Sequence, residues 1–203
     1  MFTGLENGLG LDVVLWIQTH GSPLLDFVAQ AIHVLGSPAW YLFLLLPLLL
    51  RGLKRQRAYQ WVFTLVVAIL LTDIFKLAFH APRPYQVAPD LVRMLVIQSS
   101  NYGLPSGHVA GALAMSGLAV VWGGRRWMWV LVAWTLLVGW AQMYAGVHYP
   151  QDVIAGVIVG TSALWISLRL FDRFIMWWDR IPQVARAAGI VFGLVVVFNL
   201  PGI

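Results

Sequence analysis

Six long apolar stretches constrain the fold of this chain more than any other feature of its sequence. They cover approximately residues 38–52, 60–79, 106–122, 127–146, 152–170 and 184–200. A helix of about 20 apolar residues crosses a bilayer and satisfies its backbone hydrogen bonds within one segment. The chain is 60% hydrophobic and only 10% charged, far less charged than a soluble domain. We therefore expect an all-α, polytopic membrane protein with a six-helix transmembrane bundle.

Basic residues gather in the loops on one side of this expected bundle. Ten of the thirteen Lys and Arg residues fall in the loops after the first, third and fifth spans. By the positive-inside rule, that side faces the cytoplasm. The other three (Lys76, Arg83 and Arg93) and all five histidines map to the outer half. The net charge of +5 therefore does not indicate nucleic acid binding, because no soluble basic face carries it.

Residues 8–36 form a separate N-terminal segment. The pattern predicts two short apolar helices broken at residues 21–23, with polar residues on one face at Asp12, Asp26 and His33. Such helices lie in the membrane interface, although the segment is also long enough to be a seventh span. We expect one domain over residues 1–203, in which residues 1–36 are interfacial and residues 37–203 form the six-span core.

Three short motifs place polar residues at the outer ends of the spans. Lys76, Arg83 and Pro84 close the second span, and Pro105-Ser106-Gly107-His108 opens the third. The third motif, residues 141–152, joins spans four and five and contains His148 and Asp152. Charge is costly near the hydrocarbon core and marks functional sites there. The motifs therefore indicate a site at the outer membrane surface.

The first two motifs suit a phosphate group. Lys76 supplies a point charge and Arg83 a planar fork of donors, while Pro84 favours an extended backbone at Arg83. Ser106 can cap the helix that follows, and the free N–H groups around Gly107 form an anion site at the helix start. A histidine one turn in, His108, can donate a proton.

The third motif suits a histidine nucleophile. Pro150 is favoured in the first turn of a helix, which places His148 just before the helix and Asp152 within its first turn. Asp152 can then accept a hydrogen bond from one ring nitrogen of His148 and leave the other nitrogen free to attack. His20, His33 and His80 are not defining positions of the motifs, and we expect them to be ordinary surface histidines.

At these residues the chain resembles the membrane type-2 phosphatidic acid phosphatases, or lipid phosphate phosphatases. The family pattern is Lys-x6-Arg-Pro, then Pro-Ser-Gly-His, then Ser-Arg-x5-His-x3-Asp. The first two motifs match in full, and the third matches in His148 and Asp152. The resemblance covers about residues 35–200. It implies that His148 forms a phosphohistidine, Asp152 orients it and His108 protonates the leaving group. It also implies that the phosphate is bound by Lys76, Arg83, Ser106 and Gly107.

The resemblance further implies a function and its surroundings. We expect a multi-pass cell-membrane enzyme that hydrolyses a lipid phosphate or diphosphate at the extracytoplasmic face, with no metal and no cofactor. Undecaprenyl diphosphate, phosphatidic acid and phosphatidylglycerophosphate all remain candidate substrates. The sequence leaves the oligomeric state open. It also leaves open a lipid phosphotransferase and a weakly active or non-catalytic relative that binds lipid phosphates.

One departure from the family pattern affects the phosphate site. Ala141-Gln142 stands where the family has Ser-Arg, so Gln142 offers the phosphate an uncharged amide in place of a guanidinium. A hydrogen bond to a charged group contributes about 1.5–3 kcal/mol, and one from a neutral donor contributes less. Arg93 and His80 are the candidates to replace the missing arginine. We therefore expect a weakened or specialised enzyme, in which Gln142→Arg raises activity; a drop would indicate that Gln142 fits a particular substrate.

Overall fold

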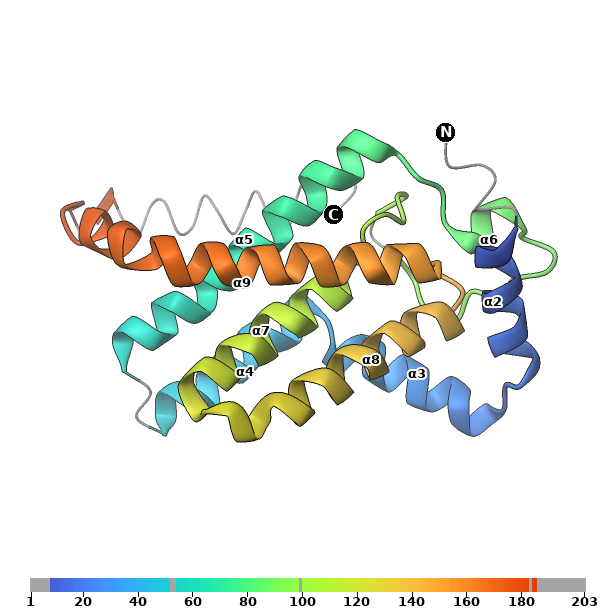
Figure 1. Ribbon diagram of the computed structural model, residues 1–203, viewed down its shortest axis with the longest axis horizontal. Coiled ribbons are helices and arrows are strands. Elements are labelled where there is room, and N and C mark those ends of the chain that lie inside the picture. Colours follow the sequence, from blue (N-terminus) through green and yellow to red (C-terminus); the bar gives the residue numbers. More distant parts are fainter. Residues whose placement is uncertain (1–7, 52–53, 99, 183, 186–203) are drawn as a thin grey trace.

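The computed structural model of the protein describes residues 8–51, 54–98, 100–182 and 184–185, and these form helices and loops without any strand (Figure 1). The elements are α2 (Leu9–Thr19), α3 (Pro23–Leu35), α4 (Pro38–Leu50), α5 (Arg55–Phe79), α6 (Pro84–Val87), α7 (Gly107–Gly123), the 3₁₀ turn η1 (Arg125–Trp127), α8 (Met128–Tyr144) and α9 (Pro150–Trp178). The all-α prediction is confirmed for these ranges. The sixth predicted span, 184–200, lies almost entirely outside the described residues.

Several of these helices are long and apolar enough to cross a membrane. Three segments meet this description: Arg55–Val87, Arg125–Tyr144 and Pro150–Trp178. A fourth candidate is the pair Pro23–Leu35 and Pro38–Leu48, which is bent by 64°. α2 and α7 are apolar but shorter. The chain is thus a multi-pass membrane protein, and its six-span count stays a prediction.

α7 is the central helix of the bundle and packs against α5, α8 and α9. Val109, Ala112 and Leu118 on α7 are completely buried. Small residues along α7 and α9 let the two backbones approach closely, which is how helices associate in lipid. Large apolar side chains such as Trp129, Leu136 and Ile158 point outward and are mostly exposed, as expected for surfaces that contact lipid.

α9 is longer than the sequence pattern suggested. The fifth span was expected over residues 152–170, but the helix continues without a break to Trp178. The extension contains no glycine or proline, and it packs on α5 through Phe63, whose ring lies 5.8 Å from Phe171 and 4.7 Å from Phe174. An ion pair between Arg55 and Asp179, at 3.9 Å, joins the same two ends.

The break between α2 and α3 lies at residues 21–23, as the sequence predicted. Ser22 is the N-cap of α3, where its Oγ accepts a hydrogen bond from the Leu25 amide at 3.3 Å, and Pro23 follows at the first helical position. α3 packs along α8, and the Asp26 carboxylate binds both Arg93 and the Tyr144 hydroxyl. α3 is therefore fixed to the bundle along one face, whereas its location in the membrane interface stays a prediction.

Candidate active site

The three motifs meet at one end of the bundle. The last turn of α5, the first turn of α7, the last turn of α8 and the first turn of α9 all lie at this end, which we call the active-site end (Figure 1). A backbone hydrogen bond of 3.0 Å from the Ser106 amide to the Asp152 carbonyl joins the starts of α7 and α9. These helix ends thus bring together residues that are far apart in the sequence.

Arg83 is the buried cation of this site. α5 ends at His80, which adopts a left-handed conformation with φ +48°, and Arg83 then takes the extended conformation that Pro84 favours, with φ −90° and ψ 159°. The side chain is 1% exposed. Its Nε donates to the Ser100 carbonyl at 3.0 Å and its Nη1 donates to the Val147 carbonyl at 2.9 Å. These bonds fix the guanidinium beside His148.

The hydrogen bonds of His148 define which ring nitrogen is protonated. Nη1 of Arg83 lies 3.2 Å from Nε2 of His148, and a guanidinium can only donate. Nε2 is therefore the acceptor, and Nδ1 carries the proton and donates it to Oδ2 of Asp152 at 3.3 Å. The same Oδ2 accepts from the Tyr149 amide at 2.9 Å, so the first turn of α9 holds the carboxylate in place. His148 presents an unprotonated Nε2 to the phosphate site.

His148 is kept neutral by its surroundings. The side chain is 1% exposed and lies in the loop between α8 and α9. Burial, with the positive charges of Arg83 and Lys76, lowers the pKa of His148 well below its ordinary value. Lys76, half-buried in the last turn of α5, therefore acts on the same ring as Arg83. A neutral imidazole is the form that can attack a phosphorus atom.

The first turn of α7 presents groups that the protein itself does not satisfy. Ser106 occupies the N-cap position of α7, but its side chain makes no capping bond, so the expectation that this side chain caps the helix is wrong. Among the described residues, Ser106 Oγ and His108 Nε2 are buried without a hydrogen-bond partner. Gly107 is the first residue of α7, where free backbone N–H groups favour an anion. Buried polar atoms need partners, and a phosphate supplies acceptors to such donors.

Gln142 contacts a residue that the motifs did not include. Its side chain is fully buried on α8, and its Nε2 lies 3.2 Å from Nδ1 of His33 on α3. The His33 ring also stacks on His108, with centroids 4.3 Å apart and planes at 25°. The expectation that His33 is an ordinary surface histidine is therefore wrong. The missing arginine at position 142 was the one sequence signal that pointed to an additional polar partner.

Neither of the candidate replacements for the missing arginine contacts Gln142. Arg93 binds the Asp26 carboxylate through both terminal nitrogens, at 3.2 and 3.3 Å. His80 is exposed, and its ring packs edge-on against Tyr102. His20 is exposed as expected, and it lies beside Trp16 on α2.

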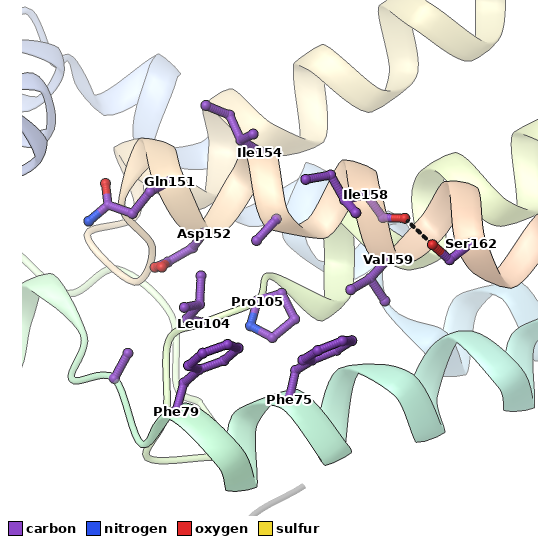
Figure 2. Close-up of a pocket in the computed structure, with 12 residues that line it drawn as sticks. Phe75, Phe79, Leu104, Pro105, Gln151, Asp152, Ile154, Ile158, Val159 and Ser162 are labelled. Atoms are coloured by element: carbon purple, nitrogen blue, oxygen red, sulfur yellow. Dashed lines mark hydrogen bonds between the residues drawn. The ribbon is translucent and has the colours of Figure 1, made fainter. Parts of the chain in front are cut away.

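An apolar cavity of about 380 Å³ opens beside the polar site, between α5 and α9 (Figure 2). Phe75 and Phe79 line it from α5, Ile154 and Ile158 from α9, and Pro105 from the loop before α7. Asp152 lies at the border between this cavity and the histidines, so a lipid chain in the cavity and a phosphate beside His148 fit a single molecule. Within the described ranges, no group of three or more His, Asp or Glu side chains is arranged to hold a metal ion.

Comparison with known proteins identifies similar chains. The sequence model of the PAP2 superfamily matches residues 57–176. An undecaprenyl-diphosphatase of Sulfolobus acidocaldarius is 32% identical over 170 residues, covering 82% of this chain and 82% of that protein. Undecaprenyl-diphosphatase BcrC of Bacillus subtilis is 25% identical over 170 residues, covering 83% and 86%. The crystal structure of LpxE from Aquifex aeolicus matches with a TM-score of 0.69 and 26% identity, covering 80% of this chain and 96% of that chain.

Proposed function

Because this chain belongs to the PAP2 superfamily and is a membrane phosphatase acting on lipid phosphates, we propose that its substrate is a polyprenyl diphosphate of the undecaprenyl type. Two relatives that match over most of their length are named undecaprenyl-diphosphatases. The apolar cavity between α5 and α9 supports a long hydrocarbon chain next to the phosphate site. Phosphatidic acid and phosphatidylglycerophosphate are the substrates to compare.

One observation carries the catalytic part of the proposal. The buried His148 holds its Nδ1 against Asp152 and its Nε2 toward Arg83, while Ser106 Oγ and His108 Nε2 lie nearby without partners among the described residues. This is the arrangement of an oriented nucleophile with phosphate-binding donors around it. The roles of Lys76, Arg83, Ser106, Gly107 and Gln142 in holding the phosphate are part of the same proposal.

The reaction proceeds in two steps. Nη1–H of Arg83 shifts its hydrogen bond from Nε2 of His148 to a phosphate oxygen, which frees the lone pair of Nε2. Nε2 then attacks the terminal phosphorus, the bond to the bridging oxygen breaks, and protonated His108 gives its proton to the leaving lipid monophosphate. The bound phosphate favours the protonated form of His108, because its negative charge lies beside the ring. A water molecule then attacks the phosphohistidine and gives a proton to His108, and the P–N bond breaks to release inorganic phosphate. Lys76 and Arg83 stabilise the charge on the transferring group.

We also propose the topology on which this function depends. Residues 37–203 form a six-span catalytic core, residues 1–36 lie in the interface, and the active-site end faces the extracytoplasmic side. The opposite end supports this orientation, because Arg51 and Arg55 lie there in the α4–α5 region and Arg125 and Arg126 precede α8. Basic residues at one end of a bundle mark its cytoplasmic side.

Phosphate release from a panel of lipids tests the proposal. The purified protein is assayed in detergent with undecaprenyl diphosphate, phosphatidic acid and phosphatidylglycerophosphate, beside His148→Ala and the control His20→Ala. We expect release chiefly from undecaprenyl diphosphate, background release by His148→Ala and unchanged release by His20→Ala, because His20 is exposed and remote from the motifs. An acid-labile phosphoenzyme should form only when His148 is present.

Other outcomes identify the alternatives. Release at background level from every lipid, equal for the protein and His148→Ala, would indicate a non-catalytic lipid-phosphate-binding protein. A product that appears only when an acceptor lipid is added would indicate a phosphotransferase. Faster release from either glycerophospholipid would replace the polyprenyl substrate while leaving the phosphohistidine chemistry intact.

A further inference from the structure

His33, Gln142 and His108 form a cluster that links three helices. The cluster joins α3, α8 and α7, because Gln142 contacts Nδ1 of His33 and the His33 ring stacks on His108. His33 lies outside residues 57–176, which the superfamily model matches. The cluster is therefore a feature that the three motifs do not contain.

The cluster occupies the position where a charged donor is missing. Gln142 is fully buried, and its Oε1 has no hydrogen-bond partner among the described residues. Its amide is neutral, so Lys76 and Arg83 are the cations that the motifs themselves provide. A transferring phosphoryl group spreads negative charge over three oxygens, and each additional charged donor stabilises it.

We propose that His33 takes the place of the absent third-motif arginine, by supporting the His108 ring through stacking and by supplying positive charge to the bound phosphate. The inference rests on the proposed function, because it assigns a further residue to the same site. His33 is the residue of the cluster that interacts with the phosphate, and Gln142 positions the His33 ring.

The Gln142 amide supports both protonation states of His33. Its NH₂ group donates to Nδ1 of the neutral ring, and after rotation its carbonyl oxygen accepts from Nδ1–H of the charged ring. The titratable and charged groups that face His33 are His108 on α7, His148 in the loop before α9 and Arg83 after α5. Burial, with the positive charge of Arg83, lowers the pKa of His33, so the ring is disfavoured as a cation in the free protein. The negative charge of the bound phosphate is therefore what favours protonated His33.

Two substitutions separate charge from packing. His33→Phe keeps an aromatic ring against His108 but removes the bond to Gln142 and the charge, and His33→Gln keeps a polar partner without charge. We expect each to lower kcat/KM for the lipid substrate by about ten- to a hundredfold, as for loss of one charge-assisted hydrogen bond. His20→Phe makes the same chemical change at an exposed position directly after α2 and should leave kcat/KM unchanged. Thermal unfolding in detergent shows whether each variant keeps its fold.

A double substitution tests replacement directly. His33→Ala with Gln142→Arg restores a permanent charge in the space that the His33 ring leaves, and it should recover most of the activity lost in His33→Ala. Gln142→Arg alone places a guanidinium against His33 in a buried position, so we now expect this single change to lower activity. The rescued enzyme should also lose less activity as the pH rises, because arginine keeps its charge while histidine deprotonates.

The two proposals fail in different ways. If the unmodified protein releases no phosphate from any lipid, the proposed function itself is wrong. If the protein is active and folded His33→Phe matches it at every pH, His33 supplies no charge to the phosphate and the replacement of arginine is overturned. If His33→Phe and His33→Gln both lose activity and His33→Ala with Gln142→Arg recovers none, His33 only maintains packing and the replacement of arginine is overturned.

Discussion

His148 shows how a single ring is tuned by its neighbours. Arg83 fixes Nε2 as the acceptor, Asp152 accepts a hydrogen bond from Nδ1–H, and burial keeps the ring neutral. The contact with Asp152 was foreseeable from the spacing of four residues between His148 and Asp152, since a helix start between them brings the two side chains together. The contact between Arg83 and Nε2 was not foreseeable, because it depends on how the loop after α5 folds against residue 147.

The lowered pKa of His148 makes a prediction about stability and pH. The unfolded chain takes up a proton near pH 6.5, whereas the folded protein does not, because the pKa of His148 is lowered in the folded state. The stability that this histidine contributes is therefore fully present above pH 6.5. It is lost as the pH falls toward the folded-state pKa, by about 1.4 kcal/mol for each tenfold rise in proton concentration. The thermal midpoint in detergent should fall more between about pH 7.5 and pH 5 for the protein than for His148→Gln.

The control for this measurement is His20→Gln, which removes an exposed histidine and should keep the acid sensitivity of the unmodified protein. An equal fall in the midpoint for the protein and His148→Gln would show that burial of His148 does not contribute to acid sensitivity.

His33 marks the limit of sequence analysis at the scale of a residue. The motifs could be recognised because each is short and local, and because helix starts and prolines position their side chains. His33 pairs with a residue 109 positions away. Its contact depends on the rotation of α3 about its own axis against α8, and an amphipathic pattern with a weak polar face does not determine this rotation.

At the scale of the element, helix-breaking glycine and proline residues made most helix boundaries predictable. Gly21-Ser22-Pro23, Pro105 and Pro150 all stand where helices begin or end. The predicted span ended too early because the charged residues after Leu168 suggest the end of a membrane span. No residue there stops a helix, so α9 continues. Whether α3 and α4 form one bent span was equally hidden, since the 64° bend depends on packing and not on hydropathy.

The close approach of α7 and α9 gives a prediction at this scale. A Cβ on Gly156 would lie 2.7 Å from the Ser106 carbonyl oxygen and 3.0 Å from Cβ of Val109, and neither atom belongs to the end of a flexible side chain. Gly156→Ala should therefore separate the two helices, lower the free energy of unfolding by about 1–3 kcal/mol and reduce phosphate release, because Ser106 and His108 move with α7. Unfolding in denaturant and phosphate release measure the two effects.

Gly117→Ala is the matched control on α7. Its Cβ would clash only with the far end of the Leu164 side chain, Cδ2 at 2.5 Å, which can rotate away, and the next atom, Cδ1 of Leu131 at 3.5 Å, is at an ordinary contact distance. This variant should keep its activity and gain up to about 1 kcal/mol from better helix propensity. A similar loss in both variants would show that the contacts of position 156 with the Ser106 carbonyl and Val109 Cβ are not the cause.

At the scale of the whole molecule, the polar site and the apolar cavity divide the recognition of one amphipathic substrate. The histidines and cations lie at the active-site end, and the cavity between α5 and α9 opens along the apolar surface of the bundle beside Asp152 (Figure 2). The sequence indicated the polar half through its motifs. The cavity was less accessible to sequence analysis, because its lining residues are ordinary apolar residues of two spans.

This division predicts a substrate-dependent effect. Ile158→Trp fills the cavity without touching the histidines, so the KM for a long-chain lipid diphosphate should rise about five- to tenfold while a short soluble phosphate ester is hydrolysed as before. Steady-state kinetics with the two substrates measures the difference. Leu168→Trp, at an exposed position farther along α9, is the control and should change neither KM. An equal effect of Ile158→Trp on both substrates would place the lipid chain elsewhere.

The uninterrupted length of α9 has a consequence for where the enzyme meets its substrate. Its 29 residues span about 43 Å, whereas the hydrocarbon layer is about 30 Å thick. Trp177 and Trp178 end the helix, and indole rings settle at the level of lipid headgroups. With that end anchored, the surplus length raises the other end, and His148 with it, to the plane of the phosphates on the far side. A thicker or thinner membrane would shift the nucleophile relative to that plane without altering any contact within the protein.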